Sequence, residues 1–383
     1  MGIKPNPIIM EWAVERSGLT RDAIISSFPA YEEWLDGSKE PTVKQILKFA
    51  NRVHVYVSDL YKDTIPNLSL RIADFRTVDD KQRSSVSPEL YETVNQMMAR
   101  QDWMRNYFIA ENRKRVDLVG MFSGEALTKG TINRIVSFLH EELKLPENWA
   151  SKFDGPAKAF RHIKDCVEQQ GISVVVNGIV GDNTHRALDV AEFRGFTLSD
   201  KIAPLIFING SDTKSAQLFT LVHELCHLTF SQTGVSNPTD ENATDSVMEK
   251  FCNEVAASFL VPDASVFEIW DHNAVPNYNR IEKIAKKHCV NFIVAARKVL
   301  DLHLIDHDEF FAAYNKYKKS VPTTSRKAAG GGDYYKTKQY RLGTVFSEAI
   351  WTAVKADYIS YRDAYNMTGL SSEKFARYYQ EAM

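Results

Sequence analysis

Two histidines and a glutamate stand close together in His223-Glu224-Leu225-Cys226-His227, inside the helical pattern LFTLVHELCHLTF. On a helix, residues four positions apart lie on one face, so both imidazoles can reach one metal ion. Zinc suits two neutral imidazoles and a carboxylate, and it keeps a fourth position open for water. The ion lowers the pKa of that water to about 7, and Glu224 can accept its proton. The motif therefore predicts a zinc hydrolase.

The alternative interpretation of this motif is a surface helix that carries two solvated histidines. Against it, the histidines are surrounded by large aliphatic residues, namely Leu221, Val222, Leu225 and Leu228. Such a helix is expected to be buried, and buried imidazoles and carboxylates need partners. The pattern thus favours a metal site.

A third ligand must come from another part of the chain, and two acidic residues are candidates. Glu249 and Glu254 both lie in the next helical pattern, EKFCNEVAASFLVP. They are five residues apart, so their side chains point in different directions on a helix. One of them is then a solvated helix charge, and spacing alone does not say which.

The elements around this motif can be predicted from caps, periodicity and turn signals. Short helices are expected before residue 66, capped by Asn6, Thr20 and Thr42, followed by a polar linker over 67–86. The further helices are expected over 88–115, 131–143, 156–170, 213–230, 245–259, most of 263–312, 342–356 and from 361 onward. The strands are expected over 172–180, 188–193 and 202–208. The lysine-rich stretch 316–341 is predicted to be a flexible basic loop.

The composition narrows the class of protein. The 383 residues suggest two or three domains, and 47 Lys+Arg against 49 Asp+Glu argue against a globally basic nucleic-acid binder. Four cysteines in so long a chain do not make a disulfide scaffold, which favours reduced thiols and a cytoplasmic location. Neither a signal peptide nor an apolar run of about 20 residues is visible, so no membrane partner is expected.

The region from about residue 155 to 262 resembles the ImmA/IrrE family of zinc metallopeptidases, which are gluzincin-like. The resemblance is carried by RGFTLSD (194–200), APLIFIN (203–209), QLFTLVHELCHL (217–228) and EKFCNEVAASFLVP (249–262). In that family the glutamate that opens the last piece is the third zinc ligand. The resemblance therefore implies that Glu249, and not Glu254, joins His223 and His227 around Zn²⁺, with Glu224 as the catalytic base.

Substrate contacts are implied less directly. In zincin-like enzymes a strand before the zinc helix forms an edge where an extended peptide pairs by β-augmentation. This implies contacts from Leu205, Phe207 and Asn209, whereas the alternative is an ordinary buried strand. His185 and Tyr278 are candidates for stabilising the oxyanion, each with a structural role as the alternative.

The N-terminal region resembles the XRE-type helix-turn-helix of phage repressors and antitoxins, from WAVERSGLTRDAI through EEWLDGSKEPTVKQILKFANRVHVYVSDLY. In such folds the third helix enters the major groove of DNA. Here that segment carries Glu32, Glu33 and Asp36, and residues 1–65 hold eight Lys+Arg against nine Asp+Glu. Phosphate binding needs clustered cations. The module therefore binds either DNA or another helix-turn-helix protein, and the basic loop is a second candidate for contacting DNA.

Together these features predict an α+β chain in four parts. These are a helix-turn-helix over 1–66, a linker and helical region over 67–150, a gluzincin-like peptidase domain with a small sheet over 151–312, and a basic loop with helices over 313–383. The resemblance implies a zinc endopeptidase that cleaves a specific repressor or antitoxin as a switch in a stress, phage or mobile-element response. The competing hypothesis is a non-proteolytic transcriptional regulator or antitoxin whose zinc domain is a sensor or a structural element.

Overall fold

The structure is a computed structural model that describes residues 4–66, 86–236, 247–270, 276–320 and 333–381. Contacts divide the chain into two compact units, Met1–Arg71 with Asp79–Asn95 and Ile72–Val78 with Gln96–Met383. The linker predicted over 67–86 falls almost entirely outside the described residues. Within the described part, no helix has the length and apolar character needed to cross a bilayer.

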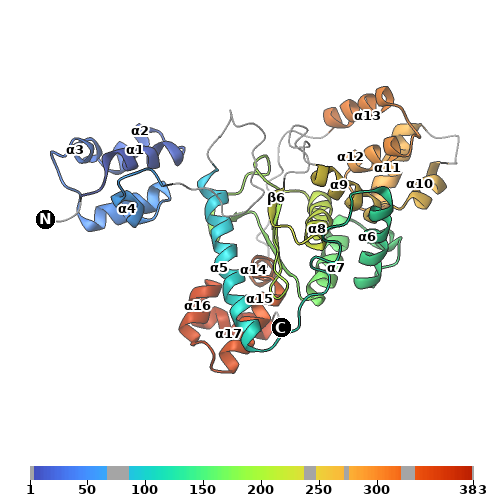
Figure 1. Ribbon diagram of the computed structural model, residues 1–383. Helices are drawn as coiled ribbons and strands as arrows, with labels where there is room; N and C mark the ends of the chain where they lie inside the picture. The colour runs from blue at the N-terminus through green and yellow to red at the C-terminus, as the bar shows by residue number, and fades with distance from the viewer. Residues whose placement is uncertain (1–3, 67–85, 237–246, 271–275, 321–332, 382–383) are drawn as a thin grey trace. The chain divides into compact units, whose positions relative to one another are not determined.

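The N-terminal unit is a small helical module (Figure 1). Its elements are α1 (Pro7–Arg16), α2 (Arg21–Ser27), α3 (Tyr31–Leu35), α4 (Val43–Val53) and the 3-10 helix η1 (Val57–Tyr61). The predicted caps form, because the side chains of Asn6, Thr20 and Thr42 accept backbone N–H groups at the starts of α1, α2 and α4. An apolar core that includes Phe49, which stacks on Tyr31, joins these helices. The helix positions are confirmed, whereas the XRE-type assignment stays a prediction.

The second unit is built around a four-stranded sheet with the order β1-β5-β4-β6. Its strands are β1 (Ser173–Asn177), β4 (Gly195–Leu198), β5 (Leu205–Asn209) and β6 (Gly234–Ser236). β5 pairs in parallel with β1 and antiparallel with β4, and β4 pairs antiparallel with β6. A separate hairpin joins β2 (Ile179–Val180) to β3 (Asn183–Ala187). The mixture of helices with this small sheet agrees with the predicted α+β class.

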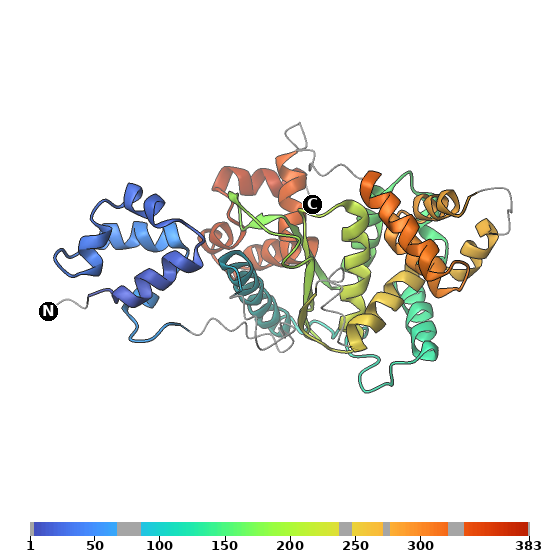
Figure 2. The same cartoon turned by 90° about the horizontal axis from the view of Figure 1, so that it is seen from above.

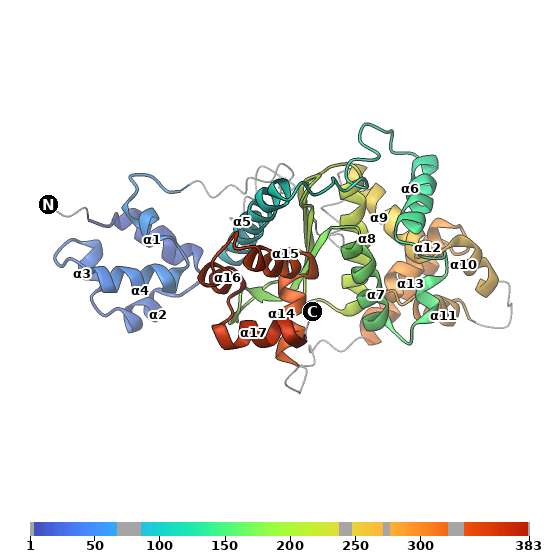
Figure 3. The same ribbon diagram turned by 90° about the horizontal axis from the view of Figure 1, so that it is seen from below.

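Helices cover both faces of the sheet. On one face α7 (Pro156–Gln169) and α8 (Lys214–Thr229) run side by side, and α9 (Val247–Leu260) packs on α8 (Figure 2). Figure 3 shows α14 (Tyr334–Leu342) and α15 (Thr344–Lys355) on the opposite side of the sheet from α8. The remaining helical elements are α5 (Pro88–Ala110), α6 (Lys129–Glu142), η2 (Trp149–Lys152), α10 (Asp263–Trp270), α11 (Asn277–Lys287), α12 (Phe292–Asp301), α13 (His307–Ser320), α16 (Tyr361–Thr368) and α17 (Ser372–Glu381).

Two of the predicted strands differ from those in the structure. Residues 188–193 do not form a strand, because the Asp189 carboxylate accepts the N–H of Ala191 and its carbonyl accepts the N–H of Phe193, which closes a turn. The strand predicted over 172–180 is divided at Gly178. A Cβ at Gly178 would lie 2.7 Å from Ser211 Oγ and 2.8 Å from Ser211 N. Only glycine allows this close approach, and the chain turns here from β1 into the β2–β3 hairpin.

The basic loop predicted over 316–341 is largely helical where the structure describes it. Its first residues end α13, and its last residues form α14, whose N-terminus is capped when Asp333 Oδ1 accepts the N–H groups of Tyr335 and Lys336. The loop prediction is therefore wrong at both ends, because local capping continues the helices into the lysine-rich stretch. Its middle part, 321–332, lies outside the described residues.

The C-terminal helices are joined to the sheet by buried charged groups. The Arg100 guanidinium on α5 donates to the carbonyl oxygens of Arg341 and Leu342, and burial lowers its pKa to about 10. On α7 the Glu168 carboxylate accepts the N–H of Thr344 at 2.7 Å and pairs with the ammonium group of Lys164. Charges buried this deeply are tolerated only with such partners. The start of α15 is thereby held against α5, α7 and β1.

Candidate metal centre

Three side chains from two helices converge on one point. His223 and His227 lie one turn apart on α8, and Glu249 reaches them from the first turn of α9. The two Nε2 atoms are 3.1 Å apart, and they lie 3.1 Å and 3.2 Å from the two carboxylate oxygens of Glu249. Ligand atoms about 2.0–2.1 Å from a tetrahedral ion are about 3.3 Å from each other. The spacing therefore matches that of three ligands around one cation.

The environment of these groups also fits a cation. His223 is fully buried, His227 is 6% exposed, and only the Glu249 side chain, at 25%, is partly accessible. Burial lowers the pKa of His227, but the hydrogen bond to Glu249 and the nearby carboxylates outweigh it and raise that pKa to about 9. Burial raises the pKa of Glu249, but the two histidines outweigh it and hold it well below its usual range. The cluster thus stabilises positive charge between its members, which a divalent ion would supply.

Glu224 lies beside this cluster and is fully buried. Its Oε2 accepts a hydrogen bond from Thr197 Oγ1 at 2.7 Å, whereas its Oε1 has no hydrogen-bond partner among the described residues. Burial raises the pKa of the carboxyl group. One oxygen of this buried carboxylate is hydrogen-bonded and the other has no partner, so the second oxygen is able to accept a proton.

The strand β4 is brought unusually close to this glutamate. A Cβ at Gly195 would lie 2.6 Å from Thr220 Cγ2 and 3.0 Å from Glu224 Oε1. Any larger residue would push β4 away from α8 or displace the carboxylate. Glycine at 195 therefore allows Thr197, two residues further along β4, to hold Glu224 in place.

Gln232 supports His227 from the segment that follows α8. Its Oε1 lies 3.2 Å from His227 Nδ1, and its backbone N–H donates to the His227 carbonyl at 3.0 Å. An amide oxygen at Nδ1 favours the tautomer with the proton on that nitrogen, which leaves the Nε2 lone pair for a metal. Gln232 is thus a positioning residue for one ligand.

Replacing Gln232 by Leu should lower metal affinity about 10- to 100-fold, because the ring loses the acceptor that sets its tautomer. The change is measured by competition against a chromophoric chelator. Gln232→Glu keeps an oxygen acceptor and serves as the control, with an affinity near that of the wild type. Equal affinities for the Leu variant and the wild type would show that Gln232 does not orient His227.

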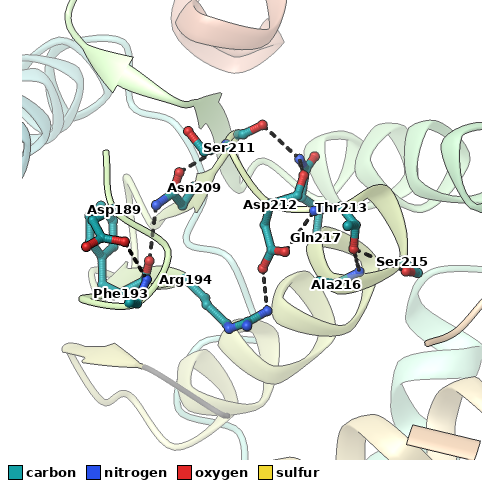
Figure 4. A network of polar contacts seen from close by, with 12 residues as sticks. Asp189, Phe193, Arg194, Asn209, Ser211, Asp212, Thr213, Ser215, Ala216 and Gln217 are labelled. Atoms are coloured by element: carbon teal, nitrogen blue, oxygen red, sulfur yellow. Dashed lines mark hydrogen bonds and ion pairs between the residues drawn. The ribbon is translucent and has the colours of Figure 1, made fainter. Parts of the chain in front are cut away.

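The start of α8 is held by a network that begins at the ends of β4 and β5 (Figure 4). The Arg194 guanidinium pairs with the Asp212 carboxylate at 2.5 Å, and Gln217 donates to the carbonyl oxygens of Gly210 and Asp212. Thr213 caps the helix by accepting the N–H of Ala216. The histidines therefore project from a helix whose first turn is tied to the sheet.

The substrate edge expected at Leu205, Phe207 and Asn209 is not an edge. β5 is hydrogen-bonded to β1 on one side and to β4 on the other, and the three residues are 0%, 1% and 0% exposed. The Asn209 amide donates instead to the Phe193 carbonyl. A central strand has no free backbone groups for a peptide, so the buried-strand alternative holds.

The remaining candidate residues lie in other surroundings. Glu254 lines a separate groove of about 880 Å³ between α6, α9 and α12. His185 is exposed on the hairpin strand β3, and Tyr278 packs on Phe292 with the Lys316 ammonium group 4.0 Å from its ring centre. Of the two glutamates considered on α9, the structure brings Glu249 to the histidines.

A comparison with family models assigns the region that carries this site. Residues 167–300 match the model of the IrrE N-terminal-like domain, peptidase M78. The matched region contains the histidine pair, both acidic site residues and the strands around them. The match indicates a metallopeptidase of the ImmA/IrrE type. Residues 342–381 match a domain of unknown function, DUF8813. No curated protein matches the chain.

Proposed function

We propose that the protein is a zinc-dependent endopeptidase. The observation that carries the proposal is the open Oε1 of Glu224, buried beside a set of two imidazoles and one carboxylate. A purely structural metal site is closed by four ligands and needs no adjacent proton acceptor, whereas a catalytic site has three protein ligands and an open position. The match to peptidase M78 supports the same interpretation.

In this mechanism His223, His227 and Glu249 would hold the zinc ion. When bound, the ion would supply Lewis acidity for peptide hydrolysis. Glu224 Oε1 accepts the proton of the attacking water, and the same carboxyl group then donates it to the leaving amine nitrogen. The Thr197 hydroxyl donates to Oε2 and so holds the carboxyl group in place, which leaves Oε1 as the oxygen that can take the proton.

We further propose that the substrate is one specific protein, a repressor or antitoxin of the helix-turn-helix type. The separate N-terminal unit supports this, because it provides a recognition module apart from the peptidase. Its α3 carries Glu32 and Glu33, which pair with the Arg21 guanidinium at 2.6 Å and the Lys39 ammonium group at 3.2 Å. A recognition segment whose nearby cations are already paired with carboxylates suits a protein better than DNA phosphates, which need clustered cations.

Incubation of the zinc-loaded protein with a purified helix-turn-helix repressor encoded beside its gene should give two fragments from a single cut. Mass spectrometry locates the cut. A chelator such as 1,10-phenanthroline should stop the cleavage, because it removes zinc from the three ligands. An intact repressor that nevertheless binds the protein would support the non-proteolytic regulator instead.

A further inference from the structure

We propose that β6 occupies the backbone edge that a substrate peptide needs, so that the chain inhibits itself until a peptide displaces these three residues. The inference rests on the proposed peptidase function and adds a regulatory element to the same site. The parts of the molecule involved are the backbone of Gly234–Ser236 and the side chains of β4 and α8.

The residues of β4 point their backbone hydrogen-bonding groups alternately toward β5 and away from it. The Asn209 N–H donates to the Arg194 carbonyl at 2.8 Å, just before β4 begins its antiparallel pairing with β5. In such a pair the residues that exchange hydrogen bonds alternate along the strand. Phe196 therefore points its backbone groups at β5, whereas Gly195 and Thr197 point theirs away from β5.

β6 lies on that outward side. Gly195 is opposite Ser236 and Thr197 is opposite Gly234, so these are the hydrogen-bonded pairs between the two strands. The backbone groups of Val235 point outward, away from β4. The outward groups of β4 are thus already used by the chain itself.

The two residues that form this outer edge of β4, Gly195 and Thr197, are also the β4 residues that contact Glu224. β6 also begins next to a ligand, since Gln232 contacts His227 and the Thr233 hydroxyl accepts the N–H of Ser199 at 2.8 Å. An extended peptide whose carbonyl is to reach Glu224 Oε1 can pair with the sheet only along this side of β4.

β6 is a short strand that is only weakly held in the sheet. It is a strand of three residues, and one of them, Gly234, loses more conformational freedom in a strand than any other residue type. A substrate would replace one antiparallel pairing by another, so the exchange is nearly balanced in hydrogen bonds. β6 therefore acts as a weak intramolecular competitor that favours long extended substrates over short ones.

Two proline variants test the proposal on the full-length, zinc-loaded protein. Ser236→Pro removes an N–H that points at Gly195, whereas Val235→Pro removes one that points outward and is the matched control. The probes are a tripeptide hydroxamate, which binds the metal and needs the β4 edge, and acetohydroxamic acid, which needs the metal alone. Ser236→Pro should bind the tripeptide probe about three- to tenfold more tightly, with Val235→Pro within twofold of the wild type.

Acetohydroxamic acid should bind all three proteins equally. If it binds and Ser236→Pro shows no gain with the tripeptide probe, the self-inhibition is overturned while the peptidase proposal stands. If acetohydroxamic acid binds none of them, the metal-dependent peptidase is contradicted, and this inference with it.

Amide hydrogen exchange of the wild type distinguishes a peptide that displaces β6 from a peptide that adds to the sheet outside β6. On binding the tripeptide hydroxamate, the Ser236 amide should lose protection while those of Gly195 and Thr197 keep theirs, because a new strand takes the place of β6. Protection gained at Val235 with Ser236 unchanged would mean that the peptide adds outside β6, and the proposal would be wrong.

Discussion

Glu224→Gln should lower kcat for cleavage of the protein substrate by about 100- to 10,000-fold while leaving metal affinity within a few-fold of the wild type. Glutamine keeps the shape and can still accept the Thr197 hydroxyl hydrogen bond. It cannot accept a proton, and general base catalysis is worth about that much in rate. The rate is measured by fragment formation with zinc-loaded protein, and metal affinity by chelator competition.

The same substitution at Glu254 is the control for this experiment, since Glu254 lies on the same helix as a metal ligand but lines the separate groove. Glu254→Gln should cleave at the wild-type rate. If Glu224→Gln cleaves at the wild-type rate, Glu224 is not the base. If Glu224→Gln loses the metal, its low rate says nothing about base catalysis, and Glu224 is instead a metal ligand.

Glu249→Gln should lower metal affinity more than about 100-fold, and with it abolish peptidase activity. The carboxylate contacts both histidines, and its negative charge would partly neutralise the positive charge of the metal ion that they bind. Removing a ligand should cost more than removing a residue that only orients one, for which about 10- to 100-fold is usual. Equilibrium dialysis against buffered zinc measures the change.

The two α9 glutamates again form a matched pair for this test. Glu254→Gln should retain full affinity, and an identical loss in both variants would indicate a general effect on α9 instead of ligation. Retained affinity in Glu249→Gln would exclude Glu249 from the ligand set.

The helices that carry the site could be predicted because their signals are local. α8 has a clear capping residue in Thr213, α9 ends before Pro262, and the spacing of His223 and His227 already places both on one helix face. Spacing could not choose between Glu249 and Glu254, because the choice depends on how α9 packs against α8. The resemblance chose Glu249, which is the one that the packing brings to the histidines.

The order of the strands in the sheet could not be predicted, because the sequence of one strand does not indicate which distant strand pairs with it. β5 has the apolar pattern of a buried strand, but nothing in it says that both its sides are hydrogen-bonded. Thr197 could have been noticed, since it lies in the RGFTLSD segment that carries the resemblance. Gln232 gave no signal, because its role depends on the turn that returns the chain to His227.

The close contact between Gly343 and β1 has a consequence for how this chain can be shortened. A Cβ at Gly343 would lie 3.0 Å from the Val174 carbonyl oxygen, so the start of α15 is packed directly on the backbone of the outermost strand. A strand edge stripped of such a cover invites pairing between molecules, which leads to aggregation. The region that matches DUF8813 starts at this cover, so a peptidase fragment cut before α14 is expected to expose the edge of β1 and to aggregate.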